Sequence, residues 1–257
     1  GLKTFLGRTG RLTGMDVLDQ IVAQPQAARF ITAKLWTFFA SENPPDEIIT
    51  ALAEEFRRAD NDFKPVLRLM FRSAAFYSDP VMGSQVKSPV QWLVGSCRLL
   101  AREVPPALPA TAALRQLGQD LFAPPNVKGW DGGISWLTTN TLLNRYHFAT
   151  ALVLGHPRAP ARAAVRNRPR TQFLPARREG APGPRPPIDV ERILPEADRR
   201  DADTLIAALE RRLLLVPLRP RQAGALRDFL QTRKGLDDAA ALNAVRLVMS
   251  TPEYQLT

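Results

Sequence analysis

The sequence QAARFITAKLWTFFA, residues 26–40, sets the class of the fold. Its apolar residues recur at intervals of three and four, which is the spacing of one face of an α-helix. Pro25 precedes it and suits the first position of a helix, where its missing N–H costs nothing. We expect a central helix whose inward side chains are Phe30, Ile31, Leu35, Phe38 and Phe39.

Amphipathic segments of the same kind lie on both sides of this helix. We expect helices over residues 15–24, 46–60, 64–76, 90–103, 111–122, 136–155, 201–215, 221–235 and 237–255. No segment alternates apolar and polar residues convincingly in the manner of a half-buried strand. The sequence therefore predicts an all-α fold: a multi-helical, bundle-like domain with a Pro/Arg-rich linker and a small C-terminal helical piece.

Residues 157–187 differ in composition from the rest of the chain, with eight prolines, eight arginines and a single acidic residue. A segment with so few aliphatic side chains cannot bury a core and favours extended, polyproline-like conformations. We therefore expect a main helical domain over residues 1–156 and a disordered linker over residues 157–187. The remaining residues, 188–257, are expected to form a helical segment that packs on the main domain.

The formal net charge of +10 comes mostly from this linker. Residues 157–187 contribute +7, and residues 1–156 contribute +3 from 16 basic and 13 acidic side chains, whereas residues 188–257 carry 11 of each. A nucleic-acid-binding domain concentrates its basic residues on one face or along one helix. The distribution favours a solvated linker over an arm that binds nucleic acid, and we expect no specific nucleic-acid partner.

Composition also limits the chemistry. No apolar run approaches the roughly 18 residues of a membrane-spanning helix, so we expect no transmembrane segment. The single cysteine, Cys97, lies in an apolar helical stretch and is interpreted as a buried thiol rather than a nucleophile. The two histidines, His147 and His156, form no pair with the spacing of metal ligands. We therefore expect neither a metal centre nor a cofactor.

The most unusual segment is PPNVKGWDGGISW, residues 124–136, which we call the Gly–Trp loop. Its glycines permit positive φ angles and the close approach of a ligand, and its tryptophans offer flat apolar faces on which a sugar or aromatic ring can stack. The candidate ligand-binding residues are Asn126, Lys128, Trp130, Asp131, Trp136 and, on the following helix, Asn140. The alternative is structural: Trp130 fills the helical core, and the glycines let the chain turn over it.

A second candidate lies near the start of the chain, where GRTGR spans residues 7–11. Arg8 and Arg11 are spaced by glycine, so an anion could bind to their guanidinium groups and to exposed backbone N–H groups. The alternative is that these arginines form salt bridges with a neighbouring helix. The sequence favours the salt bridges.

Six segments, taken in order, give the chain a family resemblance. They are KTFLGRTG (3–10), ARFITAKLWTFF (28–39), VKSPVQWLVG (86–95), LGQDLFAPPNVKGW (117–130), WLTTNTLLNR (136–145) and LVMSTPEYQL (247–256). This ordered set resembles a bacterial family catalogued as domain of unknown function 1800, abbreviated DUF1800. The resemblance extends over almost the whole chain outside the linker.

The resemblance implies an all-helical fold. It also implies a full-length protein about twice as long, of which this chain is the C-terminal half, and which begins with His- and Asn-rich motifs. Members of the family are often exported, and their genes frequently neighbour a sulfatase-like family. No activity is established for the family, so the resemblance assigns no catalytic residue.

Two hypotheses of function follow. The first is an accessory or scaffold domain that serves another exported protein, the sulfatase-like neighbour being the partner that the resemblance suggests. The second is a hydrolase or binding domain that acts on a glycan or envelope polymer through the Gly–Trp loop. The sequence leaves open whether the protein is an enzyme.

Overall fold

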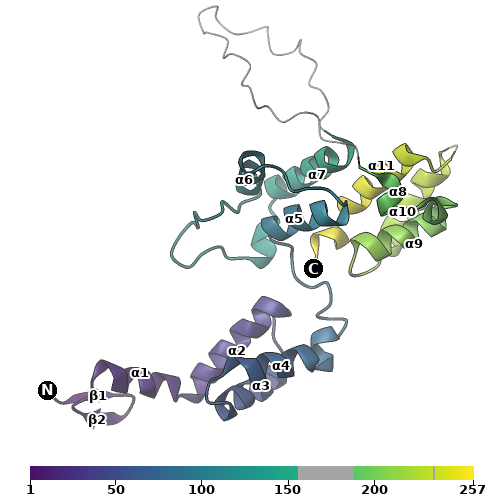
Figure 1. The fold of residues 1–257 in the computed structure, drawn as a ribbon. Helices are drawn as coiled ribbons and strands as arrows, with labels where there is room; N and C mark the ends of the chain where they lie inside the picture. The colour runs from purple at the N-terminus through teal and green to yellow at the C-terminus, as the bar shows by residue number, and fades with distance from the viewer. Residues whose placement is uncertain (156–187, 234) are drawn as a thin grey trace, which may run out of the picture. The chain divides into compact units, whose positions relative to one another are not determined.

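The computed structural model describes residues 1–155, 188–233 and 235–257. The predicted linker lies outside these residues, so its disorder stays a prediction. Contacts divide the chain into two compact units, residues Gly1–Gln85 and Val86–Thr257. The composition of the sequence predicts one main domain over residues 1–156, whereas the contacts group residues 86–155 with the C-terminal helices (Figure 1). We describe each unit by itself.

The first unit begins with a β-hairpin that the sequence analysis did not predict. Strands β1 (Lys3–Phe5) and β2 (Arg8–Gly10) pair antiparallel, with Thr4 opposite Thr9. Leu6 and Gly7 join them and both have positive φ angles, 43° and 80°, as a two-residue turn of type I′ requires. Strands of three residues are too short to produce a recognisable alternating pattern, which explains why the prediction missed them.

Helices α1 (Gly14–Val22) and α2 (Pro25–Phe39) follow the hairpin. Thr13 caps α1 in a capping box with Asp16, and Pro25 occupies the start of α2 as predicted. The inward face predicted for α2 is wrong for its phenylalanines, because Phe30, Phe38 and Phe39 are exposed and only Ile31 and Leu35 are partly buried. The side chains that α2 buries are Ala28, Thr32 and Trp36.

The reason for this difference is that α2 carries apolar residues on more than one face. Its neighbour α3 (Asp46–Arg58) selects the face that is buried, and it packs Ile49, Leu52 and Phe56 inward. Helix α4 (Phe63–Arg72) adds Val66 and Met70 to the same core. The periodicity of α3 and α4 was sufficient for prediction because each has a single apolar face.

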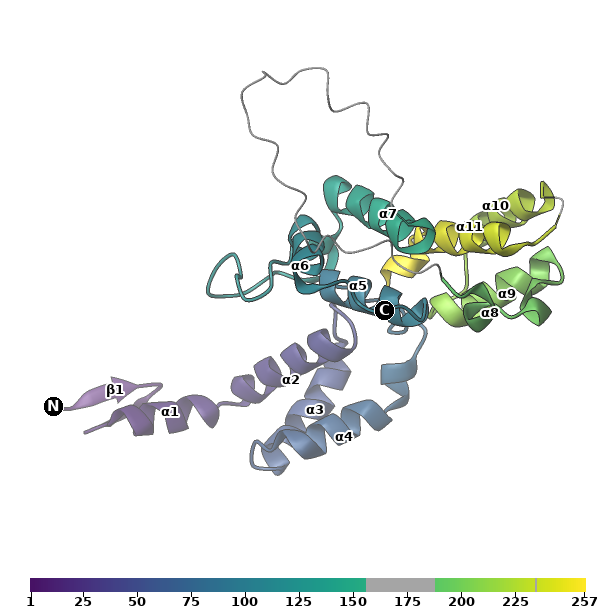
Figure 2. The same ribbon diagram turned by 45° about the horizontal axis from the view of Figure 1, so that its top comes forward.

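The second unit contains the remaining helices of the described chain (Figures 1 and 2). They are α5 (Pro89–Leu99), α6 (Ala107–Gln116), α7 (Thr139–Leu154), α8 (Val190–Ile193), α9 (Ala202–Leu213), α10 (Pro220–Gln231) and α11 (Asp238–Met249). One hydrophobic core joins helices from both sides of residues 156–187, and its buried members include Trp92, Cys97, Leu117, Leu205 and Met249. Helix α11 packs against α7, α9 and α10.

The helix boundaries follow local signals. Ser88 forms a capping box with Gln91 and precedes Pro89 at the first position of α5. Gly155, with a φ angle of 81°, ends α7. The predicted start of α7 at Trp136 is three residues too early, because Thr138 caps the helix and Trp136 belongs to a preceding 3-10 turn, Gly133–Trp136.

Apart from the hairpin and one isolated β-bridge, the described residues form helices, turns and loops, and the all-α, multi-helical prediction is confirmed. The bridge pairs Val86 with Leu256, so the first residues of the second unit lie against its last ones. This contact positions a buried polar cluster that is described below.

Candidate functional site

The Gly–Trp loop lies in the second unit, in the long connection between α6 and α7 (Figure 1). The start of this connection is fixed to α6. Arg115, in the last turn of α6, donates two hydrogen bonds to Asp120, from Nε at 2.7 Å and from Nη2 at 3.1 Å. Hydrogen bonding to Arg115 lowers the pKa of Asp120 below its usual value. Leu117, between them, is completely buried and anchors the backbone in the core.

The end of the loop is fixed by Trp136, which is only 7% exposed. The Thr141 hydroxyl donates to the Trp136 main-chain oxygen at 2.8 Å, and Thr138 and Thr141 form the capping box of α7. From the next turn of α7, Asn144 donates from Nδ2 to the Gln116 main-chain oxygen at 3.1 Å, which connects α7 to the end of α6. Both ends of the connection are therefore attached to helices.

The structure does not bring the predicted ligand-binding residues together as one set. Asn126 accepts a hydrogen bond at Oδ1 from the Lys128 backbone N–H at 2.9 Å and so stabilises its own turn. Lys128 pairs through Nζ with Oδ1 of Asp131 at 2.9 Å, and hydrogen bonding to this carboxylate raises the pKa of Lys128. This ion pair is largely exposed, so it contributes little to stability.

The two tryptophans occupy different environments. Trp136 lies in the interior, whereas Trp130 is half-buried. The structural role that the sequence analysis offered for Trp130, filling the core, is thus taken by Trp136. Asn140 is exposed in the first turn of α7. A ring that stacks on this loop can therefore use Trp130 but not Trp136.

Sequence reasoning missed the exposed large apolar side chains of this connection. Phe122 and Val127 are entirely exposed, and Ile134 is 70% exposed. We call these three side chains the apolar rim. Phe122 also has a φ angle of 63°, in the left-handed region that a bulky residue rarely adopts. The signal was present in the sequence as an apolar residue on either side of the proline pair and another after the glycines, but exposure cannot be read from it.

The arginine candidates lie on the hairpin of the first unit. Arg8 belongs to β2 and Arg11 follows it, and both side chains are exposed. Arg8 contributes to the lowered pKa of Asp16, after the hydrogen bonds from Thr13, so its charge acts on the first turn of α1. Anion binding by these arginines stays a prediction.

A cationic cluster in the second unit was also missed. Arg145 on α7 is completely buried and donates to the Lys87 main-chain oxygen at 2.7 Å and to Oε1 of Gln255 at 3.2 Å. Lys87 donates from Nζ to the Tyr254 main-chain oxygen at 2.7 Å and lies over the Tyr254 ring. Only contacts distant in sequence create this cluster, so no local motif reveals it.

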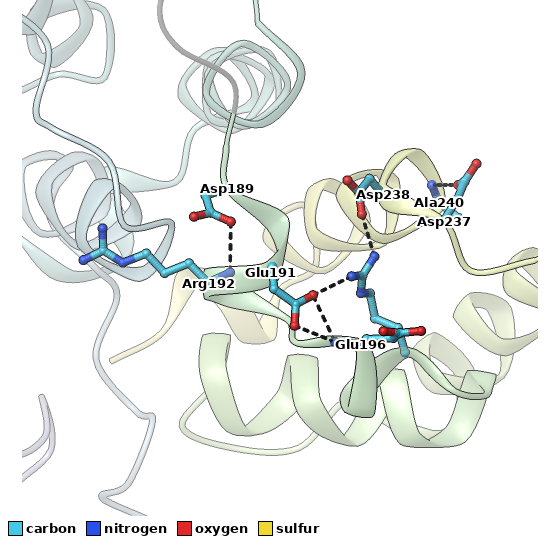
Figure 3. Close-up of polar contacts among 8 residues, drawn as sticks. Asp189, Glu191, Arg192, Glu196, Asp237, Asp238 and Ala240 are labelled. Carbon is cyan, nitrogen blue, oxygen red and sulfur yellow. Dashed lines mark hydrogen bonds and ion pairs between the residues drawn. The ribbon is translucent and has the colours of Figure 1, made fainter.

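Acidic residues also gather in the second unit, around Arg199. Figure 3 labels five of them, Asp189, Glu191, Glu196, Asp237 and Asp238. Arg199 pairs with Glu191 at 2.8 Å and with Asp238 at 2.6 Å. Figure 3 shows Asp189 and Asp237 facing the backbone of Arg192 and Ala240, and these contacts cap α8 and α11. The acidic cluster thus connects helix N-termini, and we assign it a structural role.

Within residues 1–155, 188–233 and 235–257, no three His, Cys, Asp or Glu side chains are grouped so that they could hold a metal ion. No helix in the same ranges has both the length and the apolar character to cross a membrane.

Comparison with known proteins gives one match. The model of the family described as "Protein of unknown function (DUF1800)" matches residues 1–256. No curated protein and no solved structure matches the chain. The match agrees with the resemblance drawn from the six sequence segments, and it brings no activity or ligand with it.

Proposed function

The chain belongs to the DUF1800 family, and we propose that it is an accessory or scaffold domain that binds a protein partner through the connection between α6 and α7. The observation that carries this proposal is the exposure of the apolar rim, Phe122, Val127 and Ile134, on a loop whose two ends are fixed. Exposed apolar side chains mark binding surfaces where they form a contiguous patch, and we propose that these three do so.

The energetics of Phe122 support this proposal. Its side chain buries nothing within the chain, and its left-handed backbone conformation costs about 1–2 kcal/mol for a residue other than glycine. Neither property helps the fold. Burial of such a side chain by a partner contributes about 1.5–3 kcal/mol, which offsets the backbone cost.

The anchoring of the loop also supports the proposal that it binds a protein partner. The Arg115–Asp120 pair and the buried Trp136 ring restrict the connection before any partner arrives. Binding to a restricted loop loses less conformational entropy than binding to a free one. The family resemblance suggests the partner, an exported sulfatase-like protein, and both the export and this partner belong to the proposal.

The experiment is a binding measurement between the purified chain and the proposed partner, a sulfatase-like protein from the same organism, by calorimetry or surface plasmon resonance. The double variant Val127→Ser/Ile134→Ser should weaken binding at least about tenfold, since it removes two apolar contacts. The control is Leu108→Ser, because Leu108 is 84% exposed in the first turn of α6 and lies outside the apolar rim. Equal affinities of wild type and the double variant would exclude the apolar rim as the binding surface.

A second candidate function is a hydrolase or binding domain for a glycan or envelope polymer. The half-buried Trp130, with the Asp131 carboxylate beside it in sequence, favours this candidate. It requires that Trp130→Ala reduce binding of a soluble envelope glycan while the fold is retained. Unchanged glycan binding by a folded Trp130→Ala variant would rule it out.

A further inference from the structure

Helices α10 and α11, which lie side by side in Figure 2, border a cavity of about 180 Å³ that is partly open to solvent. Its walls are mostly aliphatic, and the lining includes Leu218, Leu226, Leu247 and Val248. An aliphatic cavity of about 150 Å³ can hold a benzene molecule. The volume therefore suits one small apolar group of about that size.

One wall of the cavity is polar. Gln222, in the first turn of α10, lines the cavity, and its side-chain oxygen Oε1 is buried without a hydrogen-bond donor among the described residues. A buried acceptor that lacks a donor costs about 1–3 kcal/mol. A ligand that brings a donor to this position would remove that cost.

The buried carboxylate of Glu253 is ion-paired with the residue that precedes α10. Glu253 is 4% exposed, and neither of its carboxylate oxygens accepts a hydrogen bond from the described residues. Its ion-pair partner is Arg219, whose Nε is 3.5 Å from Oε1. Arg219 directly follows Leu218 of the cavity wall, and Glu253 lies two residues after Thr251 of the same wall, so both partners of the ion pair are close in sequence to the cavity lining.

The Arg219 side chain is a weak partner for this carboxylate. It is 73% exposed, and its contact with Glu253 lacks the geometry of a hydrogen bond. A buried carboxylate is stabilised well only when it is both paired and hydrogen-bonded. Because the guanidinium is already solvated, Arg219 can turn into water at small cost and leave Glu253 to another cation.

We propose that this end of α10 binds a primary ammonium group carried on a small apolar body. The apolar body occupies the cavity between α10 and α11, and the ammonium donates to the Glu253 carboxylate and to Gln222 Oε1 in place of Arg219. An ammonium has three donors and no acceptor, which matches two buried acceptors that lack donors. The Gly–Trp loop takes no part in this site.

Two variants should change the affinity for an ammonium ligand in opposite directions, and this is the test. Benzylammonium is titrated into the full chain at pH 7, and binding is followed by NMR through the Gln222 side-chain amide. Glu253→Gln should lower the affinity about tenfold or more, because a neutral amide replaces the charged acceptor. Arg219→Gln should raise it several-fold, because the competing cation is removed. A purely structural Glu253–Arg219 pair would not give this increase.

Two controls and one substitute variant distinguish binding at this site from general effects. Benzyl alcohol, which has the same ring and no charge, should bind about tenfold more weakly than benzylammonium. Glu196→Gln removes an exposed carboxylate of the same unit and should leave the affinity unchanged. If Glu253→Gln does not fold, Ala225→Leu, which fills the cavity from an exposed position of α10, should abolish binding by itself.

The same chemistry can come from a free amine or from a lysine side chain of a protein, and a parallel titration with Nα-acetyl-lysine amide distinguishes these sources. Tighter binding of benzylammonium identifies a free amine, and tighter binding of the lysine derivative identifies a protein side chain. The proposal is overturned if neither compound shifts the Gln222 amide, or if Glu253→Gln and Arg219→Gln change the affinity in the same direction.

Discussion

Arg145 donates a hydrogen bond from Nη2 to the main-chain oxygen of Lys87 at 2.7 Å, so two cationic residues lie together within the second unit. Burial lowers the pKa of Arg145 to about 10. Burial, and secondarily the charge of Arg145, lowers the pKa of Lys87 to about 8. Both cations therefore carry a cost in the folded state, and hydrogen bonds to main-chain and amide oxygens hold them in place.

The stability of the second unit should rise with pH through the titration of Lys87. Between pH 8 and 10.5 the unfolded chain binds more protons at Lys87 than the folded chain does, so the free energy of unfolding increases with pH. Below pH 8 the folded state bears the full cost of the buried ammonium. We expect a rise of roughly 1–2 kcal/mol between pH 7.5 and 9.5 relative to Lys87→Met, measured by urea unfolding.

The measurement is kept below pH 10 because of Tyr254, whose pKa burial raises to about 12. From pH 10 upward, the titration of this tyrosine lowers the free energy of unfolding as the pH rises. Lys128→Met is the control, since this exposed lysine has a raised pKa and should reproduce the wild-type rise. Parallel profiles of wild type and Lys87→Met would refute this account of Lys87.

Arg145→Met should raise the pKa of Lys87, because it removes the neighbouring positive charge. The pKa should still remain below 10.5, since burial is the larger cause of its shift. The pKa of Lys87 can be measured by NMR with labelled lysine. The control variant Arg227→Met, which removes a partly exposed arginine of the same unit, should leave this pKa unchanged. A Lys87 pKa that does not move in Arg145→Met would show that the two charges are not coupled.

The buried hydrogen bond between the Ser96 and Tyr254 hydroxyl groups, 2.7 Å long, should stabilise the contact of the C-terminal residues with α5. Tyr254→Phe leaves the Ser96 hydroxyl without this partner, and we expect a loss of about 1–2 kcal/mol. Ser96→Ala in the same chain should recover part of the loss. A double-mutant cycle by urea unfolding measures the coupling, and strict additivity of the two changes would contradict it.

The two tryptophans of the Gly–Trp loop should differ in their importance for stability. Trp136→Ala removes a ring that is 93% buried and should cost about 3–5 kcal/mol. Trp130→Ala removes a half-buried ring and should cost far less, about 1 kcal/mol. Thermal unfolding of both variants tests this, and similar losses would mean that Trp130 is also a core residue.

Much of the fold could be predicted from sequence because its signals are local. The prolines at the starts of α2 and α5, the cap at Ser88 and the glycine at residue 155 each determine a helix boundary through one or two residues. The buried face of α2 could not be predicted, since Phe30 and Trp36 are both apolar and only α3 decides which one is covered. The hairpin was too short to leave a pattern.

The candidate site was predicted as a segment but not as a set of side chains. The glycines and prolines of residues 124–136 correctly indicated a loop, and Gly129, Gly132 and Gly133 do have positive φ angles. The roles of Asn126, Lys128 and Trp136 depend on partners and burial that the sequence does not specify. The Lys87–Arg145 cluster depends on contacts across 58 positions of the chain, and those exist only after folding.

The central claim is that the apolar rim serves a partner and not the fold, and Phe122→Asn tests it most directly. Asparagine tolerates the left-handed conformation of this residue, which has a φ angle of 63°, and it removes the exposed ring. The free energy of unfolding and the affinity for the proposed sulfatase-like partner are measured on the same preparation. We predict that the variant is more stable by about 0.5–1 kcal/mol and binds at least about tenfold more weakly. A less stable variant that binds with unchanged affinity would contradict the claim.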